Sequence, residues 1–157
     1  PAFGAGTLYV GVATMVSATP SETEPNDDGG MANWFSLSES SVHPGYRSGS
    51  MQGQLDGFDA ADTVRIELTE PGYLSAYLQA GTVGSGLQPK LAVWADPYGV
   101  EVLAEAPAPE GADGSLQDVY VAGTEAYVRV EAVSRRSETY GNHYVLGAEV
   151  YPVPLHD

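Results

Sequence analysis

Short runs of alternating hydrophobic and polar residues recur along this chain. The clearest run covers residues 127–133, where Val128 and Val130 fall on one side while Arg129 and Glu131 fall on the other. A period of two residues is typical of a β-strand with one buried face and one solvated face. This pattern predicts a half-buried antiparallel strand.

Turn-forming residues separate these runs, since the chain contains 19 glycines and 11 prolines. Short strands divided by glycine and proline at regular intervals predict an all-β sandwich. We expect strands near Leu8–Ser17, Ser50–Leu55, Thr63–Leu68, Tyr73–Gln79, Lys90–Trp94, Val100–Ala104, Gln117–Val121, Ala126–Ala132 and His143–Val150. Asp28–Leu37 is the one segment that we expect to hold a short helix.

The length of 157 residues fits a single folded unit. We expect residues 1–20 to form an N-terminal strand and linker, and residues 21–157 to form the sandwich. The apolar stretch Leu8 to Ala18 is too short to span a bilayer. Because the chain begins at Pro1 and not at Met, we expect it to be a piece of a longer protein.

The charge of the chain excludes some partners. Twenty-one acidic residues against six basic residues give a formal net charge of −15, which repels nucleic-acid phosphates and anionic lipids. We therefore expect no nucleic-acid partner and no membrane insertion. The chain has no cysteine, so it offers no disulfide, thiolate nucleophile or zinc–thiolate site.

Acidic residues gather in the segment Glu22-Thr23-Glu24-Pro25-Asn26-Asp27. Pro25 favours extended backbone, and residues two apart in extended backbone point the same way, so Glu22, Glu24 and Asn26 should project together. Asp27 would join them if the chain turns at residues 28–30, where Asp-Gly-Gly favours a turn.

A second acidic pair, Asp59 and Asp62, lies between two expected strands. Together the two segments supply five carboxylates and an amide oxygen, which are the ligand types that Ca²⁺ takes. Two calcium ions would reduce the charge of the carboxylates from −5 to −1, whereas one ion would leave −3, so we expect two ions. The alternative is an acidic linker followed by ordinary turn residues.

Candidates for catalysis are weak. His43, His143 and His156 have no spacing typical of a zinc pair, and the chain lacks a serine-hydrolase elbow and a phosphate-binding loop. We expect no enzyme activity. Aromatic residues offer a metal-free alternative, a protein- or carbohydrate-binding module that uses exposed rings, with Tyr98 and Tyr140 as the first candidates for exposure. The other candidate rings for such a binding strip are Trp34, Trp94, Tyr73 and Tyr77.

The motifs resemble those of the bacterial pre-peptidase C-terminal domain family, which includes the collagen-binding domains of clostridial collagenases. The likeness rests on Glu22–Asp27 and on Met51–Asp62, and it continues through Leu91–Gly99, Ala126–Val130 and Gly141–Leu146. It covers the chain from about Glu22 to Val150.

The resemblance implies a jelly-roll-type β-sandwich of about 8 to 10 mainly antiparallel strands, secreted or at the bacterial cell surface and not itself catalytic. It implies an accessory role in substrate or surface attachment, folding or stability, with an extracellular protein or polysaccharide as partner. In the collagen-binding branch the matching positions bind a pair of calcium ions. Those positions are Glu22, Glu24, Asn26, Asp27, Asp59 and Asp62, with a backbone carbonyl near Tyr144 as a further ligand.

One departure from the family pattern concerns collagen. The collagen-binding branch places aromatic and apolar side chains along its tyrosine-containing strand, whereas Arg129 and Glu131 occupy the corresponding outward positions here. This difference disfavours collagen as the partner.

Overall fold

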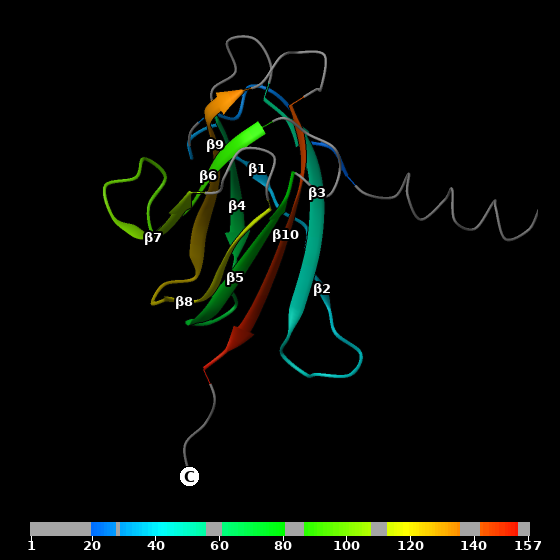
Figure 1. The fold of residues 1–157 in the computed structure, drawn as a ribbon. Helices are drawn as coiled ribbons and strands as arrows, with labels where there is room; N and C mark the ends of the chain where they lie inside the picture. Colours follow the sequence, from blue (N-terminus) through cyan, green and yellow to red (C-terminus); the bar gives the residue numbers. More distant parts are fainter. Residues whose placement is uncertain are drawn as a thin grey trace, which may run out of the picture.

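The computed structural model describes residues 20–27, 29–55, 61–80, 87–107, 113–135 and 142–153. These residues form ten strands in two five-stranded sheets and contain no helix. Figure 1 shows the two sheets as layers of one sandwich. The predicted all-β sandwich with mainly antiparallel strands is therefore confirmed.

The first sheet has the strand order β1-β4-β9-β6-β7. Its strands pair in antiparallel fashion except for β1 and β4, which run parallel. The bounds are β1 Asn33–Trp34, β4 Ala61–Glu67, β6 Leu87–Trp94, β7 Val102–Pro107 and β9 Glu125–Arg135.

The second sheet has the order β2-β3-β10-β5-β8, and all of its pairs are antiparallel. β10 lies at its centre, between β3 and β5. The bounds are β2 Ser38–Glu39, β3 Arg47–Gln54, β5 Gly72–Gln79, β8 Gly114–Val121 and β10 His143–Pro152.

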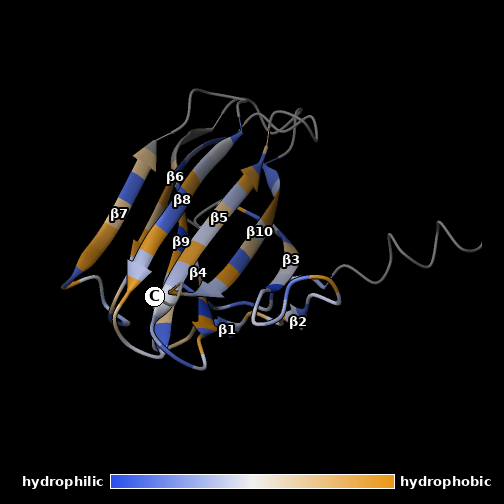
Figure 2. Ribbon diagram, turned by 90° about the horizontal axis from the view of Figure 1, so that it is seen from below, coloured by the Kyte–Doolittle hydropathy of each residue, from blue (hydrophilic) through white to orange (hydrophobic). Residues whose placement is uncertain are grey.

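The core lies between the sheets and consists of side chains that alternate along the strands. Figure 2 shows this alternation of hydrophobic and hydrophilic residues from below. In the first sheet, Val64, Val128 and Val93 are paired across three neighbouring strands, and each is 1% exposed or less. Burying a side chain of this size contributes about 1.5 to 3 kcal/mol. Leu74, Leu78 and Leu146 supply the facing layer from the second sheet.

The alternation predicted for residues 127–133 is present in β9. Val128 and Val130 are buried in the core, whereas Arg129 and Glu131 are only half-buried. The eight strands predicted between Ser50 and Val150 correspond to β3 to β10, with ends shifted by a few residues.

The prediction of a short helix at Asp28–Leu37 is wrong. The described residues of this segment hold β1, and Phe35 donates its N–H to the Arg65 carbonyl oxygen at 2.9 Å. Pairing with β4 satisfies this backbone, and Phe35 is only 5% exposed, so tertiary contacts override the local preference. β1 and β2 have two residues each, too few to produce an alternating pattern.

Several expectations fall on residues outside the described ranges, namely the strand at Leu8–Ser17, Asp59, Tyr140 and His156. The division at residue 20 likewise stays a prediction. In the part of the chain that the structure describes, no helix is long and apolar enough to cross a membrane.

Candidate metal site

The N-terminal segment of the described chain connects the two sheets. At its start, Gln52 of β3 donates its N–H to the Pro20 carbonyl oxygen at 2.9 Å and accepts the Glu22 N–H at 3.0 Å. At its end, Thr63 of β4 donates its N–H to the Asn26 carbonyl oxygen at 2.8 Å. Backbone hydrogen bonds therefore hold this segment against a strand of each sheet.

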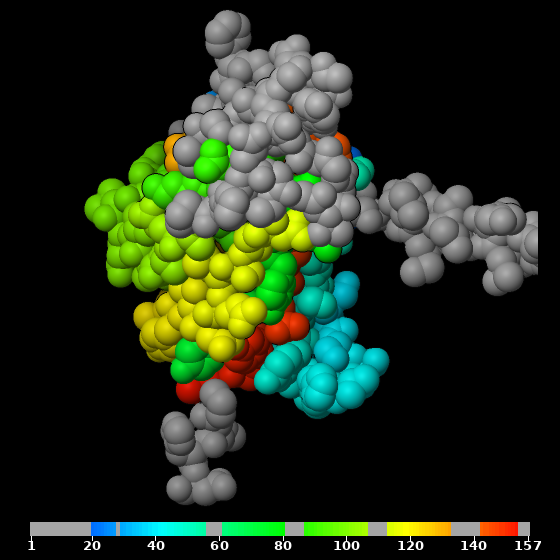
Figure 3. All heavy atoms as spheres, in the orientation of Figure 1, coloured from blue at the N-terminus to red at the C-terminus, as the bar shows by residue number. Residues whose placement is uncertain are grey.

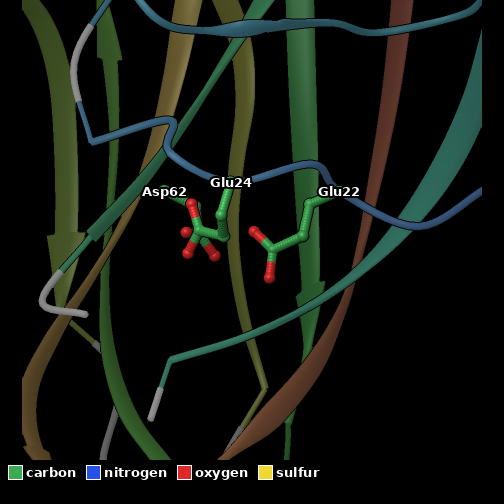
Figure 4. Close-up of side chains that lie close together, drawn as sticks. All are labelled: Glu22, Glu24 and Asp62. Atoms are coloured by element: carbon green, nitrogen blue, oxygen red, sulfur yellow. The ribbon is translucent and has the colours of Figure 1, made fainter. Parts of the chain in front are cut away.

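Three carboxylates meet where this segment crosses the sandwich. Oxygen atoms of Glu22, Glu24 and Asp62 all lie within 4.8 Å of one another. Figure 4 shows the three side chains pointing toward one common space, two from the segment and one from β4. Glu24 is exposed, Glu22 is half-buried and Asp62 is 1% exposed, so the cluster reaches from the surface to the core.

Hydrogen bonds fix the position of the Glu22 carboxylate. Its Oε1 accepts the Gln54 N–H at 2.7 Å, and its Oε2 accepts the Asn26 Nδ2–H at 3.0 Å. Glu22 and Glu24 form no ion pair with a described residue. Like charges this close repel one another, and a cation is the simplest way to neutralise them.

Asn26 lies beside the carboxylates and is completely buried, at 0% exposure. Its Nδ2 donates to Glu22 and also to the Asn33 Oδ1 at 3.2 Å, which fixes the orientation of the amide. The Asn26 Oδ1 has no hydrogen-bond partner. A buried acceptor of this kind is rare and calls for an explanation, such as an ion or a water molecule at the site.

On its core side, Asp62 is held by Tyr144 of β10, whose hydroxyl donates a hydrogen bond to the Asp62 Oδ2 at 2.6 Å. Tyr144 is 1% exposed, so the bond lies in the core. It requires glycine on the neighbouring strand, because a Cβ at Gly53 would lie 2.3 Å from the Tyr144 hydroxyl oxygen.

The structure brings together Glu22, Glu24, Asn26 and Asp62 of the six predicted ligands. The Asp27 side chain is exposed and is absent from the group of carboxylates. Its backbone carbonyl oxygen instead accepts the Thr63 hydroxyl at 3.1 Å and a guanidinium N–H of Arg129. Asp59 lies outside the described residues, and a ligand role for the Tyr144 carbonyl stays a prediction.

Some supporting residues carried no signal in the sequence. Asn33 binds the backbone of Thr23 with both atoms of its amide, accepting the N–H at 2.8 Å and donating to the carbonyl at 3.0 Å. Thr63 and Arg129 anchor the end of the segment. Only the fold brings these residues to the site, because they belong to three different strands.

The outer face of the first sheet carries arginines next to aromatic rings. The Arg129 guanidinium lies 4.9 Å from the Trp94 ring centroid, and that of Arg65 lies 4.6 Å from the Trp34 ring. Of these residues, Arg129 occupies one of the two outward positions at which the sequence disfavours collagen binding, and its guanidinium makes a cation–π contact there.

No model of a protein family and no curated protein matches the sequence. Among solved structures, the chain is similar to the pre-peptidase C-terminal domain of collagenase from Bacillus anthracis, with 14% identity and a TM-score of 0.49, over 81% of this chain and 99% of that one. It is also similar to the K3 cleaved adhesin domain of Lys-gingipain from Porphyromonas gingivalis, with 13% identity and a TM-score of 0.40, over 69% and 74% of the two chains.

A third similar structure is a GH26-CBM35 β-(1,4)-mannanase from Podospora anserina, with 14% identity and a TM-score of 0.38. The match covers 78% of this chain but 27% of the mannanase. Of these three structures, the collagenase domain belongs to the family that the sequence motifs resemble.

Proposed function

We propose that this chain is a non-catalytic calcium-binding accessory domain of an exported bacterial protein. The observation that carries the proposal is the buried Asn26 Oδ1, an acceptor without a partner beside three carboxylates. Carboxylate and amide oxygens are the ligands of hard cations. Among the described residues no histidine belongs to the group, and the chain has no cysteine, which favours calcium or magnesium over zinc.

Calcium fits this ligand set better than magnesium does. Glu24 is exposed and Asp62 is buried, so the ligands differ in their freedom to adjust, and calcium accepts irregular oxygen cages of variable number. Magnesium demands a near-ideal octahedron and retains several waters. We therefore expect calcium to bind more tightly than magnesium.

The described residues supply ligands for one ion. These ligands are the carboxylates of Glu22, Glu24 and Asp62 and the amide oxygen of Asn26. The predicted second ion depends on Asp27 and Asp59, and for this ion Asp27 would have to turn its exposed carboxylate toward the site. The number of bound ions is therefore part of the proposal's test.

The ion would act as a latch between the two sheets. Glu22 and Glu24 belong to the segment that Gln52 holds against β3, and Asp62 belongs to β4. An ion that binds all three carboxylates stabilises the folded state by mass action, by about 2.7 kcal/mol when free calcium is 100 times its dissociation constant.

The motif resemblance supports the remaining parts of the proposal. Membership of the pre-peptidase C-terminal domain family would make this a secreted or cell-surface module that aids attachment, folding or stability. Its partner would then be an extracellular protein or polysaccharide. Extracellular calcium is millimolar, so a weak site would remain occupied there.

Thermal unfolding in calcium and in chelator tests the latch. For a chain of this size, about 2.7 kcal/mol corresponds to a rise in Tm of roughly 5 to 10 °C. Glu24→Gln should abolish the difference, and Glu39→Gln, at an exposed position in β2, should preserve it. Equal melting temperatures of the native chain in both conditions would contradict the proposal.

A further inference from the structure

Four tyrosines form a continuous row across the second sheet, and we call them the tyrosine row. Tyr46 and Tyr151 have ring centroids 5.0 Å apart, Tyr151 and Tyr73 are 5.6 Å apart, and Tyr73 and Tyr120 are 5.8 Å apart. The first two pairs are stacked and the third is edge-on. The row crosses β10, β5 and β8 and begins in the residue before β3.

The tyrosine row lies on the outer face of the sandwich. Leu74 of β5 and Val150 of β10 point into the core, so their neighbours Tyr73 and Tyr151 point outward. Figure 3 shows atoms of β8 in yellow, β10 in red and the segment before β3 in cyan adjoining on one side of the molecule. Tyr120 is 50% exposed, so the end of the row is open to solvent.

A second aromatic site on the same face lies beside a glycine. Tyr77 of β5 is 40% exposed and is paired with Gly147 of β10. A Cβ at Gly147 would find its nearest neighbours only at 3.8 to 3.9 Å, so the sheet would tolerate a side chain there. Glycine instead leaves space beside the Tyr77 ring.

Small polar side chains surround these rings. Ser50 is paired with Gly147, and Ser115 is paired with Tyr77, so two hydroxyl-bearing residues flank the space. Glu149 lies on β10 between Gly147 and Tyr151 and adds a carboxylate that can accept hydrogen bonds.

The described part of this face presents no lysine or arginine. Arg65, Lys90 and Arg129 belong to strands of the other sheet, and the Arg47 guanidinium binds the Glu67 carbonyl at 2.7 Å. An anionic ligand would therefore meet carboxylates and none of the described lysines or arginines. The charge pattern favours an uncharged ligand that is rich in hydroxyl groups.

We infer that this face binds a neutral polysaccharide. A sugar ring has an apolar C–H face, which packs on the exposed rings of Tyr77 and Tyr120, and hydroxyl groups, which pair with the serines, Glu149 and phenol oxygens. A proline-rich extended peptide fits less well, because it needs slots between separated rings, whereas Tyr46, Tyr151 and Tyr73 stack on one another. The surface is separate from the metal site.

Affinity electrophoresis in calcium tests this inference. The whole chain is run through gels that contain a soluble β-glucan, a soluble xylan, a soluble galactomannan or an anionic polygalacturonate. We expect at least one neutral polysaccharide to retard the native chain, and calorimetry with that polymer gives the affinity. Tyr77→Ala and Tyr120→Ala should each weaken binding at least tenfold.

The control is Tyr98→Ala, because Tyr98 is 66% exposed but lies in the connection between β6 and β7. This variant should bind like the native chain. Gly147→Gln should also weaken binding, since its side chain would occupy the space beside Tyr77, and its Cβ would meet no atom closer than 3.8 Å.

Three results would overturn the inference. These are no retardation by any neutral polysaccharide, equal affinity in native and Tyr77→Ala chains, or binding of a triple-helical Gly-Pro-Pro peptide in place of the polysaccharides. Melting curves of each variant distinguish a lost contact from a lost fold.

Discussion

The Tyr144 hydroxyl donates a hydrogen bond of 2.6 Å to the Asp62 carboxylate in the core of the sandwich. Tyr144 belongs to the second sheet and Asp62 to the first, so this bond joins the two sheets on the core side of the candidate metal site. Hydrogen bonds to an ionised carboxylate are shorter and stronger than those between neutral groups. The bond fixes Asp62 where it meets Glu22 and Glu24.

Tyr144→Phe should lower the free energy of unfolding by about 1 to 3 kcal/mol, because it removes a buried hydrogen bond to the Asp62 carboxylate. Urea denaturation in chelator measures the change without a contribution from bound metal. Tyr98→Phe is the control and should change the value by less than about 0.5 kcal/mol. An unchanged Tyr144→Phe protein would mean that the hydroxyl does not support Asp62.

Gly53→Ala should destabilise the fold, because its Cβ would lie 2.3 Å from the Tyr144 hydroxyl oxygen and 2.4 Å from its ring carbon Cζ. Overpacking of this kind costs about 1 to 3 kcal/mol. Gly123→Ala is the matched control, since a Cβ there meets nothing within 4 Å. Equal stability of the two variants in urea would argue against a tight contact between Gly53 and Tyr144.

The turn between β6 and β7 should lose stability in acid. Asp96 accepts backbone N–H groups from Glu101 at 2.6 Å, Tyr98 at 2.9 Å and Val100 at 3.1 Å. The Glu101 bond is the largest cause that holds the pKa of Asp96 below its ordinary value of 3.8. Because the folded pKa is lowered, the stabilisation is present above pH 3.8 and is lost as the pH falls through the folded pKa.

Asp96→Ala should therefore melt at a lower temperature than the native chain at pH 7, and the gap should narrow at pH 3. Thermal scans of both proteins at the two pH values measure this difference in melting temperature. Glu70→Ala, at an exposed turn position before β5, controls for the loss of a surface charge. A gap that stays constant with pH would show that the carboxylate charge does not stabilise this turn.

The sequence pattern predicted the fold well where the alternation was long. β9 has eleven residues and β10 has ten, and strands of this length show which face is buried. The pattern failed at β1 and β2, where two residues cannot define a period. β1 forms because the adjoining Phe35 is buried and donates its N–H to the carbonyl oxygen of Arg65 in β4.

The arrangement of the candidate metal site was predicted only in part. The expected grouping of Glu22 with Glu24 is present, although the chain bends at Glu24 and is not extended there. The orientation of Asp27 depended on a turn that the sequence could not define. In the structure, Thr63 and Arg129 hold the Asp27 carbonyl, and its side chain is exposed. Contacts between distant strands are set by the fold and cannot be read from local spacing.

Calorimetric titration of the chelator-stripped chain with calcium is the most direct test of the metal site. We expect saturable binding with a dissociation constant of about 10⁻⁴ to 10⁻³ M or tighter, weaker binding of magnesium, and loss of calcium binding in Glu24→Gln. A second ion per chain that disappears in Asp59→Ala would confirm the double site. No calcium heat in the native chain, or equal binding by Glu24→Gln and the Glu39→Gln control, would contradict the calcium site.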